Sequence, residues 1–164
     1  MLFDLQQFVP SRVCLSCDGC CRFKEKESAW RPHVTGDEKS AFKKEDLDAT
    51  GRVKTIGCVH DGRHPCSFLE VSTGACRVYQ HRPFECQLYP FVLTKKNGQT
   101  TLAVHLPCPY IQEKNRTMEF EEHVGFLKIY FQRKDVLDFL KKNPALAGEY
   151  PGCEDELETL FTVL

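Results

Sequence analysis

The sequence predicts an α+β fold: a small metal-organised domain with short β-hairpins around a cysteine cluster and with helices packed around them. Two β-prone runs flank Asn97-Gly98, which is the strongest short-range signal for a β-hairpin. Apolar residues recur with a helical period between residues 118 and 143. The chain also contains ten cysteines, four of them in the stretch CLSCDGCC at residues 14–21. Thiols packed so closely indicate a shared metal, structural disulfides or redox chemistry.

The length and charge of the chain indicate how many domains it has and which classes of partner it can bind. A chain of 164 residues fits a single domain, residues 1–164, with a metal-binding core at 14–110 and C-terminal helices at 118–164. Its 22 Lys and Arg balance 23 Asp and Glu, so we expect no nucleic-acid-binding surface. No apolar stretch approaches the length of a membrane span. The expected partner is a metal ion or cluster, and a protein partner is left open.

The N-terminal segment MLFDLQQFVPSRVC bears on the cellular compartment. It has neither a basic region nor a long apolar run, so we predict no signal peptide and a cytoplasmic location. In a reducing cytosol, clustered cysteines are more often metal ligands or redox groups than structural disulfides. The compartment therefore favours a metal site over a disulfide framework.

Three elements are predicted in the first half of the chain. Residues 35–47 are expected to form a helix, because Thr35 and Glu38 have the spacing of a capping box. Residues 66–79 have two short apolar runs around a Ser-Thr-Gly turn and are expected to form a hairpin. Residues 82–90 are expected to form one or two helical turns, with Pro83 at the first helical position.

Three further elements are predicted in the second half. Residues 90–106 are expected to form a hairpin around Asn97-Gly98. Residues 118–143 are expected to be helical, and 154–164 to form a short closing helix. The apolar residues of the long helical segment can share core-facing stripes. One stripe comprises Phe120, Val124, Leu127, Tyr130 and Phe131, and the other Val136, Leu137 and Leu140.

Eight cysteines near turns or element ends form the candidate metal site. At such positions a thiolate can be aimed at a common centre, and backbone N–H groups are free to donate to sulfur. Cys86 follows Pro83, so we expect the helix N-terminus to lower the pKa of its thiol. Arg82 either offsets thiolate charge or pairs with a carboxylate. The candidate ligands are Cys14, Cys17, Cys20, Cys21, Cys66, Cys76, Cys86 and Cys108.

The spacing leaves zinc and an iron–sulfur cluster both open. Zinc sites in small domains usually take paired Cys-x2-Cys knuckles, and only the first such pair is present here. Neighbouring residues in an extended backbone point in different directions, so Cys20 and Cys21 are expected to serve two centres or two corners of one cluster. The Cys-x2-Cys-x2-Cys run is also the spacing with which ferredoxins hold a [4Fe–4S] cluster. We expect an iron–sulfur cluster in preference to Zn²⁺.

The order of the cysteines resembles that of the YkgJ-like family, which is named for its Cys-x2-Cys-x2-Cys-Cys motif and described as zinc- or iron-chelating. The chain has CLSCDGCC at residues 14–21, CSFLEVSTGACRVYQHRPFECQLYPF at 66–91 and a Cys-Pro pair at 108–109. The resemblance covers about residues 14–110 and implies a metal site at the eight cysteines. Cys58 and Cys153 fall outside the pattern, and we expect them to lie outside the site.

The resemblance also raises an enzymatic alternative. Flagellin lysine N-methylases share the cysteine motif and use S-adenosylmethionine with an iron–sulfur centre. The present chain has no Gly-rich dinucleotide-type loop. It also lacks the Cys-x3-Cys-x2-Cys triad of radical enzymes, because position 24, where the third cysteine would stand after Cys17 and Cys21, is Lys24. A methylase-like or redox enzyme is therefore the second hypothesis, and a structural zinc protein that mediates a protein interaction is the third.

Overall fold

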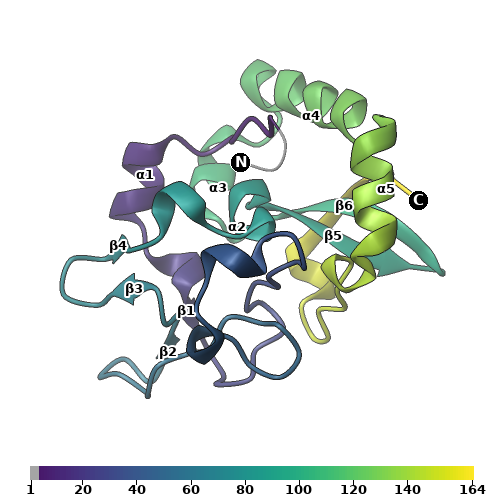
Figure 1. The fold of residues 1–164 in the computed structure, drawn as a ribbon. Helices are drawn as coiled ribbons and strands as arrows, with labels where there is room; N and C mark the ends of the chain where they lie inside the picture. Colours follow the sequence, from purple (N-terminus) through teal and green to yellow (C-terminus); the bar gives the residue numbers. More distant parts are fainter. Residues whose placement is uncertain (1–3) are drawn as a thin grey trace. The chain divides into compact units, whose positions relative to one another are not determined.

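The computed structural model describes residues 4–164. The chain divides into two compact units, and each is considered by itself (Figure 1). One unit is Pro10–Gln87, and the other combines Met1–Val9 with Leu88–Leu164. Helices and small antiparallel sheets occur in the same chain, which confirms the α+β fold class. The prediction of a single domain over residues 1–164 stays a prediction.

The unit Pro10–Gln87 is made of short elements joined by turns. Its two sheets have two strands each, with β1 paired to β2 and β3 paired to β4. The β3–β4 pair, with Leu69 opposite Cys76, confirms the hairpin predicted within residues 66–79. The elements are α1 Ser11–Ser16, η1 Gly19–Cys21, β1 Arg22–Phe23, η2 Lys39–Ala41, η3 Lys44–Asp46, β2 His64–Pro65, β3 Leu69–Glu70, β4 Ala75–Cys76, η4 Tyr79–His81 and α2 Phe84–Leu88, whose last residue belongs to the other unit.

The hydrophobic core of this unit includes cysteines among its apolar residues. Cys66 is 7% exposed and is one of the buried residues of the core, and the partly buried Cys21 and Cys76 pack against it. Burial of a thiol without a partner costs little, because free cysteine behaves as a small apolar residue. The other buried members of this core are Phe23, Val34, Val53, Phe68 and Leu69.

The predicted helix over residues 35–47 is wrong, because this segment contains only the two 3-10 turns η2 and η3. The capping contact itself forms, since Glu38 Oε2 accepts a hydrogen bond from the Thr35 N–H at 2.9 Å. The helix does not continue because Phe42 has an extended backbone, with φ −124° and ψ 150°. Its ring packs with its centroid 5.4 Å from that of Phe68. Tertiary packing here overrides helix propensity.

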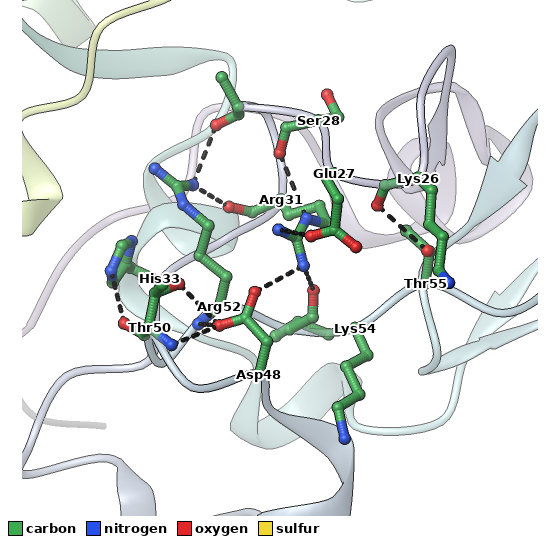
Figure 2. Close-up of polar contacts among 12 residues, drawn as sticks. Lys26, Glu27, Ser28, Arg31, His33, Asp48, Thr50, Arg52, Lys54 and Thr55 are labelled. Carbon is green, nitrogen blue, oxygen red and sulfur yellow. Dashed lines mark hydrogen bonds and ion pairs between the residues drawn. The ribbon is translucent and has the colours of Figure 1, made fainter.

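A buried arginine holds the long connection between β1 and β2 together (Figure 2). Arg31 is 5% exposed, and its guanidinium contacts Glu27 at 2.6 Å and Asp48 at 2.8 Å. Asp48 also accepts hydrogen bonds from the backbone N–H groups of Thr50 and Arg52. A buried charge is stable only when it is paired in this way. The connection is therefore an ordered loop rather than a loose one.

The second unit contains a three-stranded antiparallel sheet in the order β5-β6-β7. The hairpin predicted at residues 90–106 is confirmed, with β5 and β6 joined by Asn97 (φ 52°) and Gly98 (φ 79°). These two positive φ values are those of a type I′ turn, which Asn-Gly adopts readily. The elements are β5 Phe91–Lys96, β6 Gln99–His105, α3 Pro109–Lys114, α4 Met118–Tyr130, α5 Lys134–Lys142, η5 Pro144–Leu146, η6 Glu154–Glu156 and β7 Leu157–Thr162.

The predicted closing helix at residues 154–164 is wrong. Only one 3-10 turn, η6, forms there, and β7 then pairs antiparallel with β6. Leu157 lies opposite His105, and Phe161 lies opposite Leu102. A two-stranded hairpin alone is only marginally stable, so a third strand that completes the sheet outweighs a short local helix.

The predicted helical segment 118–143 forms two helices, α4 and α5, which run in different directions (Figure 1). All five residues of the first predicted stripe are buried. In the second stripe Val136 and Leu140 are buried, whereas Leu137 is only half-buried and Phe139 is buried instead. The helix is interrupted at residues 131–133, so α5 does not continue the helical phase of α4. Phe139 therefore faces the core in place of Leu137.

Candidate metal centre

Two short helical turns position the first four cysteines. Cys14 lies in α1, and Cys17 directly follows that helix, with its N–H donating to the Cys14 carbonyl at 3.3 Å. Cys20 and Cys21 lie in η1, and the Cys21 N–H donates to the carbonyl of Asp18 at 3.0 Å. Each turn thus fixes two thiols through the backbone.

Backbone pairing brings the later cysteines of the unit to these turns. The Cys66 N–H donates to the Cys21 carbonyl at 2.8 Å, next to the β1–β2 pair. Cys76 ends β4, and β4 lies near α1, which carries Cys14. Cys86 lies in the middle of α2.

The thiols of this unit interact electrostatically, with Cys20 at the centre of the network. Ionised Cys20 would repel the thiolates of Cys14, Cys66, Cys76 and Cys86, and this repulsion contributes to the raised pKa of each of these four thiols. Cys17 acts on Cys14, and Cys21 shares a hydrogen bond with Cys20. These seven thiols of the unit Pro10–Gln87 are called the cysteine network below, and their convergence on one metal stays a prediction.

Backbone hydrogen bonds act on two of the thiols. The backbone of Phe68 and Leu69 acts to lower the pKa of Cys66, and the backbone of Val78 acts in the same direction on Cys76. Hydrogen bonds of this kind favour the thiolate form. Burial nevertheless raises the pKa of Cys66 to about 11, and burial likewise raises the pKa of Cys76. The expectation that the backbone at turns forms hydrogen bonds with sulfur is met at these two cysteines.

Arg82 and Tyr79 lie at Cys14. Arg82 is 8% exposed, and its Nη1 lies 3.7 Å from Cys14 Sγ. Its Cζ lies 4.0 Å from the centroid of the Tyr79 ring, and the Tyr79 hydroxyl also donates to the thiol. Burial and Cys20 raise the pKa of Cys14, while Arg82 and Tyr79 oppose that rise. Arg82 is therefore placed to donate to Cys14 Sγ, and its role in offsetting thiolate charge stays a prediction.

The expectation of a lowered pKa at Cys86 is wrong. Burial and the neighbouring thiols raise the pKa of Cys86 well above its usual value. The helix α2 does begin directly after Pro83, but its first N–H, that of Phe84, donates to the Glu38 carboxylate at 2.7 Å. The helix N-terminus is therefore occupied by another anion.

The extended backbone that was expected to point Cys20 and Cys21 in different directions is not found. Their backbone is a 3-10 turn rather than extended, and the two Sγ atoms lie 4.0 Å apart. Their hydrogen bond raises the pKa of Cys20 well above its usual value. Both thiols thus face a common space, and adjacent positions in the sequence do not force them toward different centres.

Three cysteines remain, namely Cys58, Cys108 and Cys153. Cys108 is buried and precedes α3 in the second unit, so its predicted place in the site stays a prediction. Cys58 is exposed and Cys153 is partly buried. All ten cysteines are free thiols in this structure.

The donor set fits a soft metal or an iron–sulfur cluster. Ionising several neighbouring thiols costs energy because like charges repel, and a bound cation removes that cost by deprotonating its ligands. Within residues 4–164, no three His, Cys, Asp or Glu side chains are already arranged at coordinating positions. The fit therefore rests on the chemistry of the thiols, their backbone hydrogen bonds and Arg82.

Two contributors were missed at the level of sequence. Tyr79 is not among the predicted site residues, but its hydroxyl donates to Cys14. Tyr79 lies three residues before Arg82, and this spacing is the sequence feature that could have indicated a contact of Tyr79 with the site. Glu38 was expected to cap its own helix, and the contact of its second oxygen with Phe84, 46 residues along the chain, leaves no trace in a local motif.

Together the fold and the thiol network define a small α+β protein organised by a cysteine cluster. Residues 13–142 match the family described as "CxxCxxCC: Putative zinc- or iron-chelating domain". The chain belongs to this family, which confirms the resemblance and extends it past residue 110 through α4 and α5. No curated protein and no solved structure matches the chain. Across the described residues, no helix has both the length and the apolar character needed to cross a membrane.

Proposed function

We propose that this protein is a cytoplasmic iron–sulfur protein whose cluster is held by the cysteines of the network together with Cys108. Membership of a zinc- or iron-chelating family supports metal binding in general. The Cys-x2-Cys-x2-Cys run at Cys14, Cys17 and Cys20 favours a cluster, because this spacing wraps three corners of one in ferredoxins. When bound, such a cluster would supply one-electron chemistry.

The observation that carries the proposal is the placement of free thiols within the unit Pro10–Gln87. The Sγ atoms of Cys20 and Cys21 lie 4.0 Å apart, the Cys66 N–H donates to the Cys21 carbonyl at 2.8 Å, and Arg82 Nη1 lies 3.7 Å from Cys14 Sγ. The residues of this unit would stabilise the thiolate ligands of a bound cluster and would tune its reduction potential. Backbone hydrogen bonds act to lower the pKa of Cys66 and Cys76, and the guanidinium of Arg82 donates to Cys14, which are contacts of the kind that have these effects.

Zinc is the second candidate, and one distance favours it. Four thiolates around a zinc ion at about 2.3 Å have sulfur atoms roughly 3.8 Å apart, if the site is tetrahedral. The Sγ atoms of Cys20 and Cys21 are 4.0 Å apart. This pair alone is therefore close to one edge of a zinc site.

Elemental analysis of protein purified without air separates these candidates. An iron–sulfur protein should contain iron and acid-labile sulfide, be brown, and bleach on reduction with dithionite. A colourless protein with stoichiometric zinc would select the second candidate. Protein that contains none of these, even after reconstitution, would refute both. A change in the spectrum on addition of S-adenosylmethionine would instead indicate an enzyme, and cell fractionation tests the location.

A further inference from the structure

We propose that Glu38 is a positioning residue for the metal centre: its carboxylate caps the first turn of α2 and so fixes the helix that carries Cys86. This role rests on the proposed metal-binding function of the same site. It also gives a purpose to the long connection between β1 and β2, residues 24–63, which lies between the two halves of the cysteine pattern.

Both carboxylate oxygens of Glu38 are occupied, and the residue is only 8% exposed. Its Oε2 accepts hydrogen bonds from the N–H of Thr35 at 2.9 Å and from the Thr35 hydroxyl at 2.8 Å. Its Oε1 accepts one from the N–H of Phe84 at 2.7 Å. The first N–H groups of a helix have no partner within it, so Glu38 satisfies one of them from a distant segment.

The helix α2 depends on such external support. It has five residues, Phe84–Leu88, and a helix of that length is unstable by itself. A carboxylate near the N-terminus is favourable because it faces the positive end of the helix dipole. Cys86 lies two residues after Phe84, so any movement of the first turn moves this thiol as well.

A second contact ties the same two segments together. The carboxylate of Glu85 accepts a hydrogen bond from the backbone N–H of His33, five residues before Glu38. The chain from residue 33 to residue 38 is thus joined to the start of α2 at two points. One of these is Phe84 and the other is Glu85, the residues that directly precede Cys86.

The connection that carries Glu38 is itself held at both ends. Figure 2 shows Arg31 joined to Asp48 and Glu27, which ties together two parts of the connection on either side of Glu38 in the sequence. At its far end, Thr55 forms a β-bridge with Cys66, and the Ser67 N–H donates to the carbonyl of Lys54 at 2.9 Å. The connection therefore supports the backbone at Cys66 as well as the helix at Cys86.

Paired substitutions separate positioning from simple stability. Glu38→Ala removes the contact with Phe84 and the contacts with Thr35. Thr35→Val removes only the hydroxyl donor and leaves the bond to Phe84 in place. Glu45→Ala is the control, because Glu45 is exposed on the same connection. Each variant is loaded with Zn²⁺, and its retention of Zn²⁺ is measured against increasing EDTA, with circular dichroism as a check of the fold.

We expect Glu38→Ala to lose Zn²⁺ about 10–100-fold more readily, as for other groups that support metal ligands. Thr35→Val and Glu45→Ala should retain Zn²⁺ like the parent. Glu38→Gln should recover part of the loss, because its amide oxygen still accepts from Phe84, and it provides the comparison if Glu38→Ala does not fold.

Two results would overturn the role of Glu38. One is parent-like retention in Glu38→Ala, or in Glu38→Gln if that variant has to carry the comparison. The other is an equal loss in Glu38→Ala and Thr35→Val, which would mean that the capping contacts serve only the local fold. A parent protein that retains neither Zn²⁺ nor iron is a different result, since it refutes the proposed function and this role together.

Discussion

The guanidinium of Arg82 lies 3.7 Å from the thiol of Cys14, 68 residues earlier in the chain. Arg82 is buried, and its Cζ stacks over the ring of Tyr79 at 4.0 Å. A cation held so rigidly beside a thiol opposes the effect of burial on that thiol. It is therefore placed to stabilise Cys14 as a thiolate ligand.

Replacing Arg82 by Ala should weaken metal retention by about 10–100-fold, because a thiolate ligand loses its nearest cation and hydrogen-bond donor. Arg82→Lys should recover part of the loss, since it keeps the charge but not the planar donor group. Chelator competition measures both variants. Arg63→Ala is a matched control, because Arg63 is exposed. Retention equal in Arg82→Ala and in the control would contradict this account.

Cys108→Ser should reduce the metal content of anaerobically purified protein, because we predict that Cys108 is the eighth ligand. Cys58→Ser and Cys153→Ser should leave the content unchanged, since both residues fall outside the cysteine pattern of the family. Elemental analysis of the three variants in parallel measures the difference. Full metal content in Cys108→Ser would confine the site to the unit Pro10–Gln87.

Asp48 should stabilise the protein in a pH-dependent way. Burial tends to raise its pKa, but hydrogen bonds from Thr50, Arg52 and Arg31 outweigh burial and lower the pKa to about 2. Its contribution is therefore complete above the unfolded value of 3.8 and is lost as the pH falls toward 2. We expect Asp48→Asn to lower the free energy of unfolding by about 2 kcal/mol at neutral pH.

Urea unfolding of the parent and of Asp48→Asn, followed from pH 7 downward, checks this prediction. The gap between the two proteins should narrow once the pH falls below about 4. A gap that stays constant over the whole range would show that the carboxylate charge of Asp48 does not matter.

His123 should make the free energy of unfolding depend on pH over a higher range than Asp48 does. It packs against Phe91 with ring centroids 5.3 Å apart, and burial lowers its pKa from 6.5 to about 4. The folded state thus disfavours the charged imidazole. Stability should be complete above pH 6.5 and fall by about 1.4 kcal/mol per pH unit down to pH 4, a total of about 3 kcal/mol.

The variant His123→Phe keeps an aromatic ring but cannot take up a proton, so its unfolding free energy should vary less over the same range. Thermal or urea unfolding at several pH values between 4 and 7 measures both profiles. Identical slopes in the parent and in His123→Phe would refute the assignment to His123.

Local signals predicted the elements that depend on local chemistry. Asn97-Gly98 adopts positive φ values with little strain, so the β5–β6 hairpin follows from two residues. Pro83 fixes the start of α2 for a similar reason, since proline suits a helix start. The cysteine pattern also predicted a shared metal site, and that prediction stays a prediction, although Cys66 is hydrogen-bonded to Cys21 across 45 residues.

Three of the failures involve contacts between distant parts of the chain. The capping box at Thr35 formed, but Phe42 packs on Phe68 and the helix ends. The final segment pairs with β6, a partner more than 50 residues earlier, instead of forming a helix. The pKa of Cys86 is raised rather than lowered because the folded chain buries this thiol and places it near Cys66 and Cys20. None of these partners can be found within a local window of sequence.

The hydrogen bond between Cys66 and Cys21 has a consequence for how this chain can change during evolution. It closes a loop of about 45 residues, and the entropy of closing a loop grows so slowly that doubling its length costs only about 0.6 kcal/mol. Insertions and deletions between these two cysteines should therefore be tolerated, provided that Glu38 and Thr55 keep their contacts. The length of this loop is consequently a poor criterion for recognising related proteins, whereas its two points of attachment are a good one.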